Sequence, residues 1–381
     1  MAFDLTWMLW GLPLAFALGW GASRLDLRQW RLESRRAPKA YFRGLNHLLN
    51  EQQDQAIDAF IEAVQSDPDT AELHFALGNL FRRRGDYDRA VRVHEHLLAR
   101  ADLSRKDRDR AQHALALDFL KAGLLDRAEA ALHKLEGSSF EAEALLALLT
   151  IYERSRDWPQ ARRVAQRLQA ADQGNFTKRL AHYLCEEAEQ AQRSGHSAQA
   201  QRLLIQAVQQ APQLARGWLA LSALKAQAGD ASGAFDALLQ LAQQAPQGLP
   251  LAAGTLADLA TQTDQQEHAA AVLQAAQVQA PTIDVTQALA RLSVDPQAAR
   301  AHFLQHLKRE PSLVMAAQWL SAETLSHPDA KTQVQAALEQ ASAPLKRYRC
   351  AACGFEARQH FWHCPGCQSW DSYPARRVEE L

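Results

Sequence analysis

A 34-residue period restricts what this chain can fold into more than any other feature of the sequence. Two small residues recur at this interval, since Gly44 and Ala56 in one stretch are matched by Gly78 and Ala90 in the next. Small side chains at these positions let the two helices of a hairpin cross closely, and Pro68 ends the second helix of the first unit. Because self-similarity at such a period is typical of stacked helical hairpins, the chain is expected to form a repeat array.

The period continues through most of the chain. The later units are marked at corresponding offsets by Ala128, Leu132 and Leu135; Tyr152, Ala161, Ala165 and Leu168; Leu184, Ala188, Ala200, Leu204, Ala207 and Pro212; Trp218, Leu221, Ala234, Leu238, Leu241 and Pro246; and Ala269, Leu273, Ala276 and Pro281. Residues 283–343 keep helical periodicity without the pattern, which predicts one or two degenerate pairs capping the stack. The alternative, an irregular helical bundle, would not repeat alanine at one offset.

This spacing is that of a tetratricopeptide repeat, so we expect an all-α superhelical solenoid over residues 37–343. The first helices of such hairpins line a concave surface that binds peptides or proteins. In the second and third units the candidate groove residues are Phe75, Asn79, Arg82, Arg83, Arg110, His113 and Lys121. They form a basic, amphipathic wall, although any single arginine in it could equally belong to an ordinary solvated face.

An uncharged stretch of 19 residues, Leu5–Ser23, precedes the repeats. As a helix it would extend about 28 Å, close to the thickness of a bilayer's hydrocarbon core. Trp7, Trp10 and Trp20 lie toward its ends, where indoles favour the membrane interface. A cleaved signal peptide would need a basic amino-terminal region, which is absent, and a buried soluble helix is the other alternative. We therefore expect residues 1–23 to form a transmembrane anchor.

The segment after this stretch is basic. Residues 24–39 contain six basic and two acidic side chains, a net charge of +4, although the whole chain carries only -1. The positive-inside rule places this side in the cytoplasm. Residues 24–36 are therefore expected to be a juxtamembrane linker, with the amino terminus outside and the bulk of the chain in the cytoplasm.

Four of the five cysteines lie close together near the carboxyl end, in the pattern C-x2-C-x10-C-x2-C. Two C-x-x-C turns can direct four thiolates at one metal ion, which predicts a tetrahedral site of Cys350, Cys353, Cys364 and Cys367. Four thiolates suit zinc or iron, and a redox dithiol pair is the alternative. Gly354 and Gly366 are expected to relieve the bends of the two turns. The residues 344–381 form the expected metal-binding domain.

The residues around these turns look like rubredoxin knuckles. Tyr348, Phe355 and Trp362 are expected to pack around the cysteines, while His360 and His363 are read as neighbours of the site rather than ligands. The fifth cysteine, Cys185, stands alone in the repeats and is expected to be a small core or groove residue.

Motifs for catalysis are missing from the sequence: GxSxG, HExxH and a phosphate-binding glycine loop do not occur. The chain is therefore expected not to be an enzyme. Separately, the near-zero net charge argues against a protein that coats nucleic acid.

Taken together, the expected anchor, repeats and knuckle pair resemble the lipopolysaccharide assembly protein B family of Gram-negative bacteria. The most specific matches are LGNLFRRRGDYDRAVR (Leu77–Arg92), AGLLDRAE (Ala122–Glu129) and YRCAACGF…WHCPGCQSW (Tyr348–Trp370). The resemblance implies an inner-membrane regulator with its amino terminus in the periplasm. It also implies that the metal domain packs against the repeats.

The partners implied by the resemblance are proteins. They are the membrane protease FtsH, the lipid A-committing deacetylase whose degradation the family promotes, and an inner-membrane, lipopolysaccharide-sensing protein that resembles a hydrolase. A homo-oligomer stays possible. The alternatives are a scaffold for lipopolysaccharide assembly enzymes, a membrane-tethered electron carrier of the rubredoxin type, and a nucleic-acid-binding zinc ribbon. The last is disfavoured because Glu356, Asp371, Glu379 and Glu380 dilute the basic residues near the knuckles.

Overall fold

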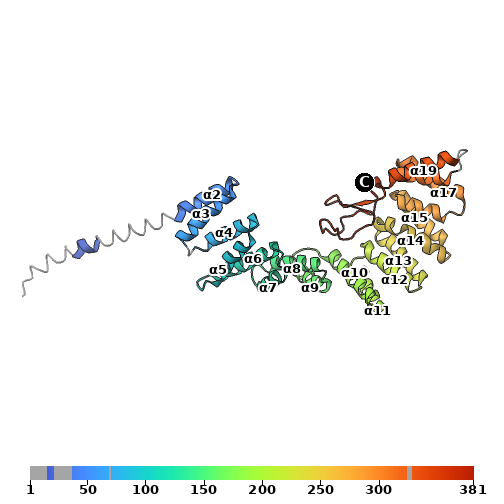
Figure 1. The fold of residues 1–381 in the computed structure, drawn as a ribbon. Helices are drawn as coiled ribbons and strands as arrows, with labels where there is room; N and C mark the ends of the chain where they lie inside the picture. The colour runs from blue at the N-terminus through green and yellow to red at the C-terminus, as the bar shows by residue number, and fades with distance from the viewer. Residues whose placement is uncertain (1–14, 21–36, 68–69, 324–327) are drawn as a thin grey trace, which may run out of the picture. The chain divides into compact units, whose positions relative to one another are not determined.

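The computed structural model describes residues 15–20, 37–67, 70–323 and 328–381, and the chain divides into two compact units, residues 1–155 and 156–381 (Figure 1). Of the expected anchor, residues 15–20 are described and helical. The rest of the anchor and the basic linker 24–36 lie outside the described residues. Within the described part of the chain, no helix combines the length and apolar character that crossing a bilayer requires.

Unit 1 is built of antiparallel helical hairpins. Its helices are α2 (Ala37–Leu49), α3 (Gln53–Ser66), α4 (Ala71–Arg84), α5 (Tyr87–Ala99), α6 (Arg105–Lys121), α7 (Leu125–His133) and α8 (Glu141–Ser155). The apolar stripes of α2, α3 and α4 meet in one core around Phe60, Leu77 and Phe81. Each hairpin therefore buries its apolar face against its neighbour in the stack.

The repeated glycines of unit 1 lie where two helices approach each other. A Cβ atom on Gly44 would lie 2.7 Å from the ring of Phe60, and one on Gly78 would lie 2.5 Å from the ring of His94. The sequence predicts Ala56 and Ala90 at the same helix crossings. In the structure a ring four residues beyond each alanine fills the space above the glycine.

Unit 2 continues the same architecture and ends in a small ribbon. Its helices are α9 (Trp158–Ala170), α10 (Thr177–Arg193), α11 (Ser197–Gln210), α12 (Ala215–Gln227), α13 (Ala231–Gln244), η1 (Pro246–Gly248), α14 (Leu249–Gln262), α15 (Gln266–Gln279), α16 (Ile283–Leu292), α17 (Pro296–Arg309), α18 (Leu313–Ala322) and α19 (Pro328–Ser342). Strands β1 (Tyr348–Arg349) and β2 (Glu356–Ala357) pair antiparallel, and η2 (Val378–Glu380) follows.

Side-chain caps fix where several helices begin. Ser104, Asp157, Asp230 and Ser312 each accept a hydrogen bond from a backbone N–H in the first turn of the helix that follows. These are residues that N-cap positions prefer, because they satisfy amides that have no partner inside the helix.

The stretch after residue 283 forms two further hairpins, α16 with α17 and α18 with α19. Both first helices are short, with 10 residues each, which explains why the repeat pattern fades there. The expected all-helical tetratricopeptide-like fold with a carboxyl-terminal four-cysteine ribbon is confirmed.

Candidate functional site

The four cysteines of the ribbon come together in one cluster. Their Sγ atoms all lie within 4.8 Å of one another. Cys350 and Cys367 are separated by 3.8 Å between sulfurs, and Cys353 and Cys364 by 3.7 Å. Four thiolates about 2.3 Å from one metal ion would define a tetrahedron with edges of about 3.8 Å. The cluster therefore has the dimensions of a metal site, and its sulfurs are too far apart for a disulfide.

The backbone of the two knuckles follows the same path. Gly354 donates its N–H to the Cys350 carbonyl at 2.9 Å, and Gln368 donates to the Cys364 carbonyl at 2.8 Å. Both residues have positive φ, 78° for Gly354 and 59° for Gln368. In the second knuckle Gln368, and not Gly366 as expected, therefore takes the left-handed conformation. Gly366 instead lies against the other knuckle, where a Cβ atom on it would be 3.6 Å from Cys353 Sγ.

Hydroxyl groups and amides surround the sulfurs. Ser372 Oγ lies 3.2 Å from Cys350 Sγ, and Ser369 Oγ lies 3.3 Å from Cys367 Sγ. Burial alone would raise the pKa of Cys350, but the hydrogen bonds from Ser372 and from backbone amides lower it to about 6. Cys350 is therefore prepared to serve as a thiolate ligand.

A full set of four thiolates needs a cation among them. The backbone amide of Phe355 favours the thiolate of Cys353, but desolvation and the neighbouring thiols raise its pKa to about 12. The pKa of Cys367 is lowered, chiefly by the hydroxyl and the amide of Ser369. The four thiols therefore do not all ionise by themselves near neutral pH, whereas a bound metal ion would stabilise all four as thiolates.

Aromatic residues close the buried side of the cluster. Tyr348 and Tyr373 pack with Cys350 and Cys364, and Tyr373 donates its hydroxyl to the Phe355 carbonyl at 3.1 Å. Phe355 itself is 44% exposed and contributes less to this core than expected. The cluster therefore has a dry inner side and an open outer side, where Cys353 and Cys367 are exposed.

The two histidines of the ribbon lie outside the sulfur cluster. His360 Nε2 pairs with the Tyr373 carbonyl at 3.0 Å, and His363 Nε2 pairs with the Gln368 carbonyl at 2.8 Å. Both therefore support the fold of the knuckles, in the position of neighbours to the ligands.

The ribbon docks onto the repeats of unit 2 through Trp370. Its ring makes edge contacts with Trp158 of α9 and Tyr183 of α10, with centroids 6.1 Å and 5.9 Å away. Trp362, expected beside the cysteines, packs instead against the repeat core of α12 to α16, and its ring lies 6.2 Å from that of His182 on α10. Two tryptophans of the ribbon thus anchor it to the helices.

A buried polar contact accompanies these rings. His182 of α10 is fully buried, and its Nε2 lies 2.9 Å from Asp371 Oδ1. Arg216 of α12 approaches His182 Nδ1 at 3.4 Å and donates to Glu186 at 2.7 Å. An arginine can only donate, so Nδ1 accepts and Nε2–H donates to Asp371. Burial lowers the pKa of His182 despite the nearby carboxylate, so the ring is held neutral.

The last five residues strap the ribbon to the end of the stack. Arg377 forms a two-pronged ion pair with Asp284 at 2.8 and 2.9 Å. Glu380 accepts the N–H of Ile283, at the start of α16, at 2.6 Å. Glu379 accepts the hydroxyl of Ser312, the N-cap of α18, at 2.6 Å. Carboxylates at helix N-termini are favourable, so the tail caps two neighbouring hairpins.

The candidate groove residues of unit 1 separate into structural and exposed ones. Phe75 is 1% exposed and lies under the guanidinium of Arg110, 4.1 Å from its ring centroid, so it belongs to the core. Arg82 donates to the buried carboxylate of Asp118 at 2.8 Å and to the side chain of Asn79. These contacts give Arg82 a structural role between hairpins.

The other candidates are more accessible. His113 stacks on Phe140 with ring centroids 5.0 Å apart, and burial lowers its pKa. Lys121 and Arg83 are exposed. Arg83 and Asn79 line a cavity of about 190 Å³ between α2, α3 and α4. This cavity is where unit 1 presents both apolar and basic groups together.

Cys185 is buried, with 3% exposure, and burial raises its pKa to about 11. It is the small core residue that its position in the repeat suggested, at the wall of a cavity between α10 and α12.

The sequence alone does not predict the docking role of His182, Asp371, Arg377, Glu379 and Glu380. A histidine within the apolar run LAHYLC is a visible signal for His182. In the sequence the acidic tail residues only dilute the nearby basic charge, because their role as caps depends on a fold that brings them to distant helices.

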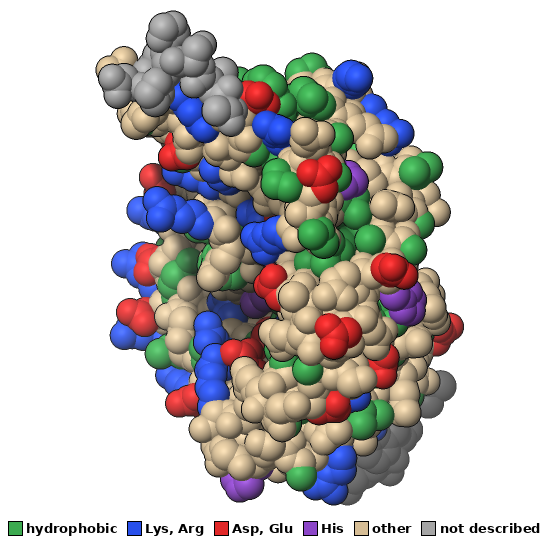
Figure 2. All heavy atoms as spheres, turned by 90° about the vertical axis from the view of Figure 1, so that its right-hand side faces the viewer, with side chains coloured by type: hydrophobic (Ala, Val, Ile, Leu, Met, Phe, Trp, Pro, Cys, Tyr) green, Lys and Arg blue, Asp and Glu red, His purple; other side chains and the backbone are tan. Residues whose placement is uncertain are grey.

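Basic and acidic side chains lie close together on the surface. On the face drawn in Figure 2, Lys and Arg side chains lie interspersed with Asp and Glu among apolar ones. Near the knuckles, Arg347 and Arg349 both form ion pairs with Glu356.

Comparisons with known proteins agree with this architecture. Residues 348–373 match a family described as a rubredoxin metal binding domain, and residues 73–110 match the tetratricopeptide repeat. The chain is 31% identical to lipopolysaccharide assembly protein B of Escherichia coli (strain K12), over 97% of this chain and 98% of that protein. It is 28% identical to the protein of the same name from Haemophilus influenzae, over 95% and 96% of the two chains.

Among solved structures, a tetratricopeptide repeat protein from Parabacteroides merdae aligns with 67% of this chain and 98% of its own. Its sequence is 12% identical, and the TM-score is 0.34.

Proposed function

The chain belongs to the lipopolysaccharide assembly protein B family, and from this membership we propose that it is a non-enzymatic adaptor of the bacterial inner membrane. The relatives are named for lipopolysaccharide assembly, and this chain contains tetratricopeptide repeats, a class of repeat that binds proteins. In the proposal it brings the lipid A-committing deacetylase to the membrane protease FtsH and so promotes degradation of the deacetylase. An inner-membrane protein that senses lipopolysaccharide restrains this activity.

The observation that carries the proposal is the docking of the metal ribbon. The ribbon contacts α9 and α10 through Trp370 and reaches α16 and α18 through Glu380 and Glu379. It therefore spans several hairpins of unit 2. This arrangement supports a metal centre that stabilises a docking surface, because a mobile electron carrier would not need such attachment.

The metal-binding residues have a defined part in this proposal. Cys350, Cys353, Cys364 and Cys367 would hold one zinc or iron ion, which supplies the cross-link between the two knuckles. The ribbon has few residues for a core of its own, and a domain this small depends on such a cross-link. Trp370 and Asp371 follow the last ligand, Cys367, closely in the sequence. Their contacts with α10 therefore depend on the knuckle being closed.

The proposed adaptor is tethered through residues 1–23, with its amino terminus in the periplasm and the repeats in the cytoplasm. Tethering raises the effective concentration of two partners in the same membrane without any new contact between them. The basic segment that follows supports this orientation. Fusing a periplasm-only reporter after Arg36 should give no reporter activity, and an active fusion would contradict the orientation.

The decisive experiment measures the half-life of the deacetylase in cells that carry or lack this protein, with crosslinking and purification of its partners. The proposal predicts a longer half-life without the protein and recovery of both the protease and the deacetylase in the crosslinked complex. An unchanged half-life with recovery of assembly enzymes would support the scaffold instead.

A further inference from the structure

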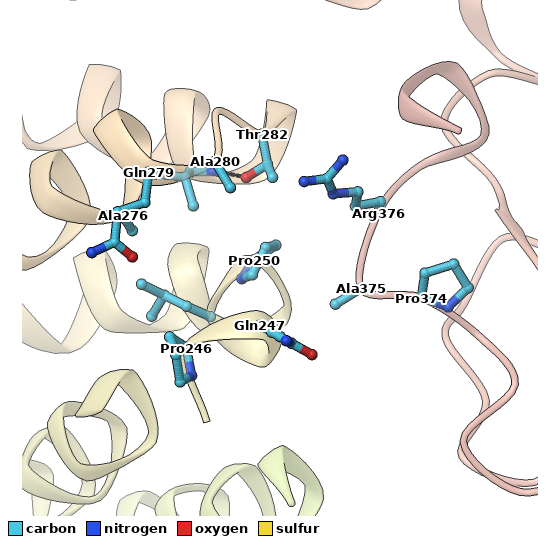
Figure 3. Close-up of a pocket in the computed structure, with 12 residues that line it drawn as sticks. Pro246, Gln247, Pro250, Ala276, Gln279, Ala280, Thr282, Pro374, Ala375 and Arg376 are labelled. Atoms are coloured by element: carbon cyan, nitrogen blue, oxygen red, sulfur yellow. Dashed lines mark hydrogen bonds between the residues drawn. The ribbon is translucent and has the colours of Figure 1, made fainter. Parts of the chain in front are cut away.

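A cavity of about 550 Å³ opens between two repeat turns and the carboxyl-terminal tail of unit 2 (Figure 3). One wall is formed by η1 and the start of α14, with Pro246 and Pro250, and another is the turn between α15 and α16, with Ala280. The tail closes the third side with Pro374 and Arg376. This volume lies in the range of ligand-binding sites. We call it the tail cavity.

The walls of the tail cavity are mostly apolar. Leu249 and Val285, each 1% exposed, connect it to the repeat core, and prolines form much of its rim. Such walls suit an apolar side chain, because burying it removes hydrocarbon surface from water.

A single cation faces this apolar space. Arg377 has an extended backbone, with φ −77° and ψ 162°, and its side chain is held by Asp284. Neighbouring side chains of an extended segment point to opposite sides. Arg376 is therefore turned the other way, and Figure 3 shows its guanidinium directed toward Thr282. In the described part of the chain no carboxylate lies at ion-pair distance from Arg376, but its guanidinium is near enough to Glu380 to favour the charged form of that carboxylate.

The tail itself shows what kind of segment this face of the repeats accepts. Residues 374–381 contain two arginines and two glutamates and include the 3-10 turn η2, and Glu380 and Glu379 lie at the N-termini of α16 and α18. A segment that presents carboxylates to the repeats is thus already bound beside the cavity. At the rim, the amides of Gln247 and Gln279 can hydrogen-bond a peptide backbone.

We propose that the tail cavity binds an extended peptide of a partner protein, with a large apolar side chain between the prolines and an adjacent carboxylate on Arg376. An arginine beside an apolar cavity can pair with a carboxylate through two parallel hydrogen bonds, which gives orientation as well as affinity. The proposal rests on the protein-docking role proposed above and adds the chemistry of one docking peptide.

The test selects random peptides of about nine residues by display against the full-length protein in detergent. The binding of each enriched peptide is then measured by fluorescence anisotropy. Enriched peptides should share an acidic residue next to a large apolar one. Arg376→Glu should weaken their binding by about tenfold or more, and Arg376→Lys by less.

Two further variants separate the cavity from the charge. Ala280→Trp should fill the cavity from its exposed rim and weaken binding by a similar factor, although it leaves Arg376 in place. The matched controls Ala271→Trp and Arg202→Glu change exposed residues of the same unit outside the cavity and should leave binding unchanged.

The proposal is overturned if no acidic, apolar sequence is enriched, or if enriched peptides bind the Ala280→Trp protein as well as the parent. It is also overturned if enriched peptides bind the Arg376→Glu protein as well as the parent. A protein that binds such peptides but does not change deacetylase turnover would refute the adaptor role alone, so the two failures are distinguishable.

Discussion

Each of the two units of the protein contains a group of one histidine, one aspartate and one arginine. One group connects neighbouring repeats, and the other connects the repeats to the ribbon. In unit 1, His94 of α5 lies 2.5 Å from Asp118 of α6, which also accepts from Arg82 of α4 at 2.8 Å. In unit 2, His182 of α10 bonds to Asp371 of the ribbon, 189 residues away, and Arg216 approaches the other ring nitrogen.

The carboxylates differ in exposure. The side chain of Asp118 is 0% exposed and forms an ion pair with Arg82 and a hydrogen bond with His94, whereas that of Asp371 is 35% exposed and contacts a neutral histidine. The unit 1 group fixes neighbouring repeats to each other. The unit 2 group fixes the repeats to the ribbon, whose four cysteines form a metal-binding site. The stability of unit 1 is therefore expected to be independent of metal, and that of unit 2 to depend on it.

The largest effect is expected when the metal is lost. Cys364→Ser should abolish binding of the metal, since binding free energies of structural sites are on the order of 10 kcal/mol. Hydrogen exchange should then lose protection in the ribbon and α10, while α4 and α6 keep theirs. Cys185→Ala, which changes the cysteine outside the cluster, should retain one metal ion per chain by elemental analysis.

Full protection of α10 in the metal-free variant would contradict the structural role of the metal. Loss of protection throughout unit 1 would contradict the independence of the two units.

The next effect compares the two aspartates directly. Asp118→Ala leaves a buried arginine and histidine without their partner and should lower the free energy of unfolding by about 3–5 kcal/mol. Asp371→Ala removes a partly solvated hydrogen bond and should cost about 1 kcal/mol. Chemical denaturation measures both losses of unfolding free energy, and hydrogen exchange on α5 and α10 locates them. Asp109→Ala on α6 serves as the control, and equal losses for Asp118 and Asp371 would remove the distinction between the groups.

A smaller effect is expected at the tail. Glu380→Gln keeps a hydrogen-bond acceptor at the start of α16 but removes its negative charge, which should cost about 0.5–1 kcal/mol. Exchange of the Ile283 amide should become faster while that of α12 is unchanged. An unaltered Ile283 amide would mean that the tail does not cap this helix in solution.

The smallest effect is a dependence on pH. Burial depresses the pKa of His182 in the folded protein below its usual value of 6.5, so the unfolded state binds the proton more readily. The neutral His182 side chain makes its full contribution to the free energy of unfolding above pH 6.5. This contribution decreases as the pH falls through 6.5, by at most about 1.4 kcal/mol per pH unit. Melting temperatures of unit 2 between pH 7.5 and 5.5 should show this slope, and His182→Gln should reduce it. A slope of opposite sign would contradict a neutral His182.

Local patterns predicted much of the fold. Gly44, Gly78 and the repeated alanines identified the hairpins because close helix packing limits side-chain size at fixed offsets. The cysteine spacing predicted the metal cluster because its geometry depends mainly on two short turns. The match to lipopolysaccharide assembly protein B in sequence confirms the resemblance that these patterns suggested.

Contacts between distant segments could not be predicted in the same way. His182 and Asp371 are each ordinary in their local sequence, and only the docking of the ribbon brings them together. The repeat position of Phe75 predicts a groove residue, but the side chain of Arg110 covers it. Gln368 takes a left-handed turn for which glycine would be the usual choice, so the residue type gave no signal.

The capping of α16 and α18 by Glu380 and Glu379 also bears on how the protein is made. The residues that cover the starts of α16 and α18 follow every repeat helix in the sequence and therefore leave the ribosome after the helices they attach to. Until residue 379 has been made, these two helix starts have only their own caps, Thr282 and Ser312, so this part of the stack is completed after all of its helices.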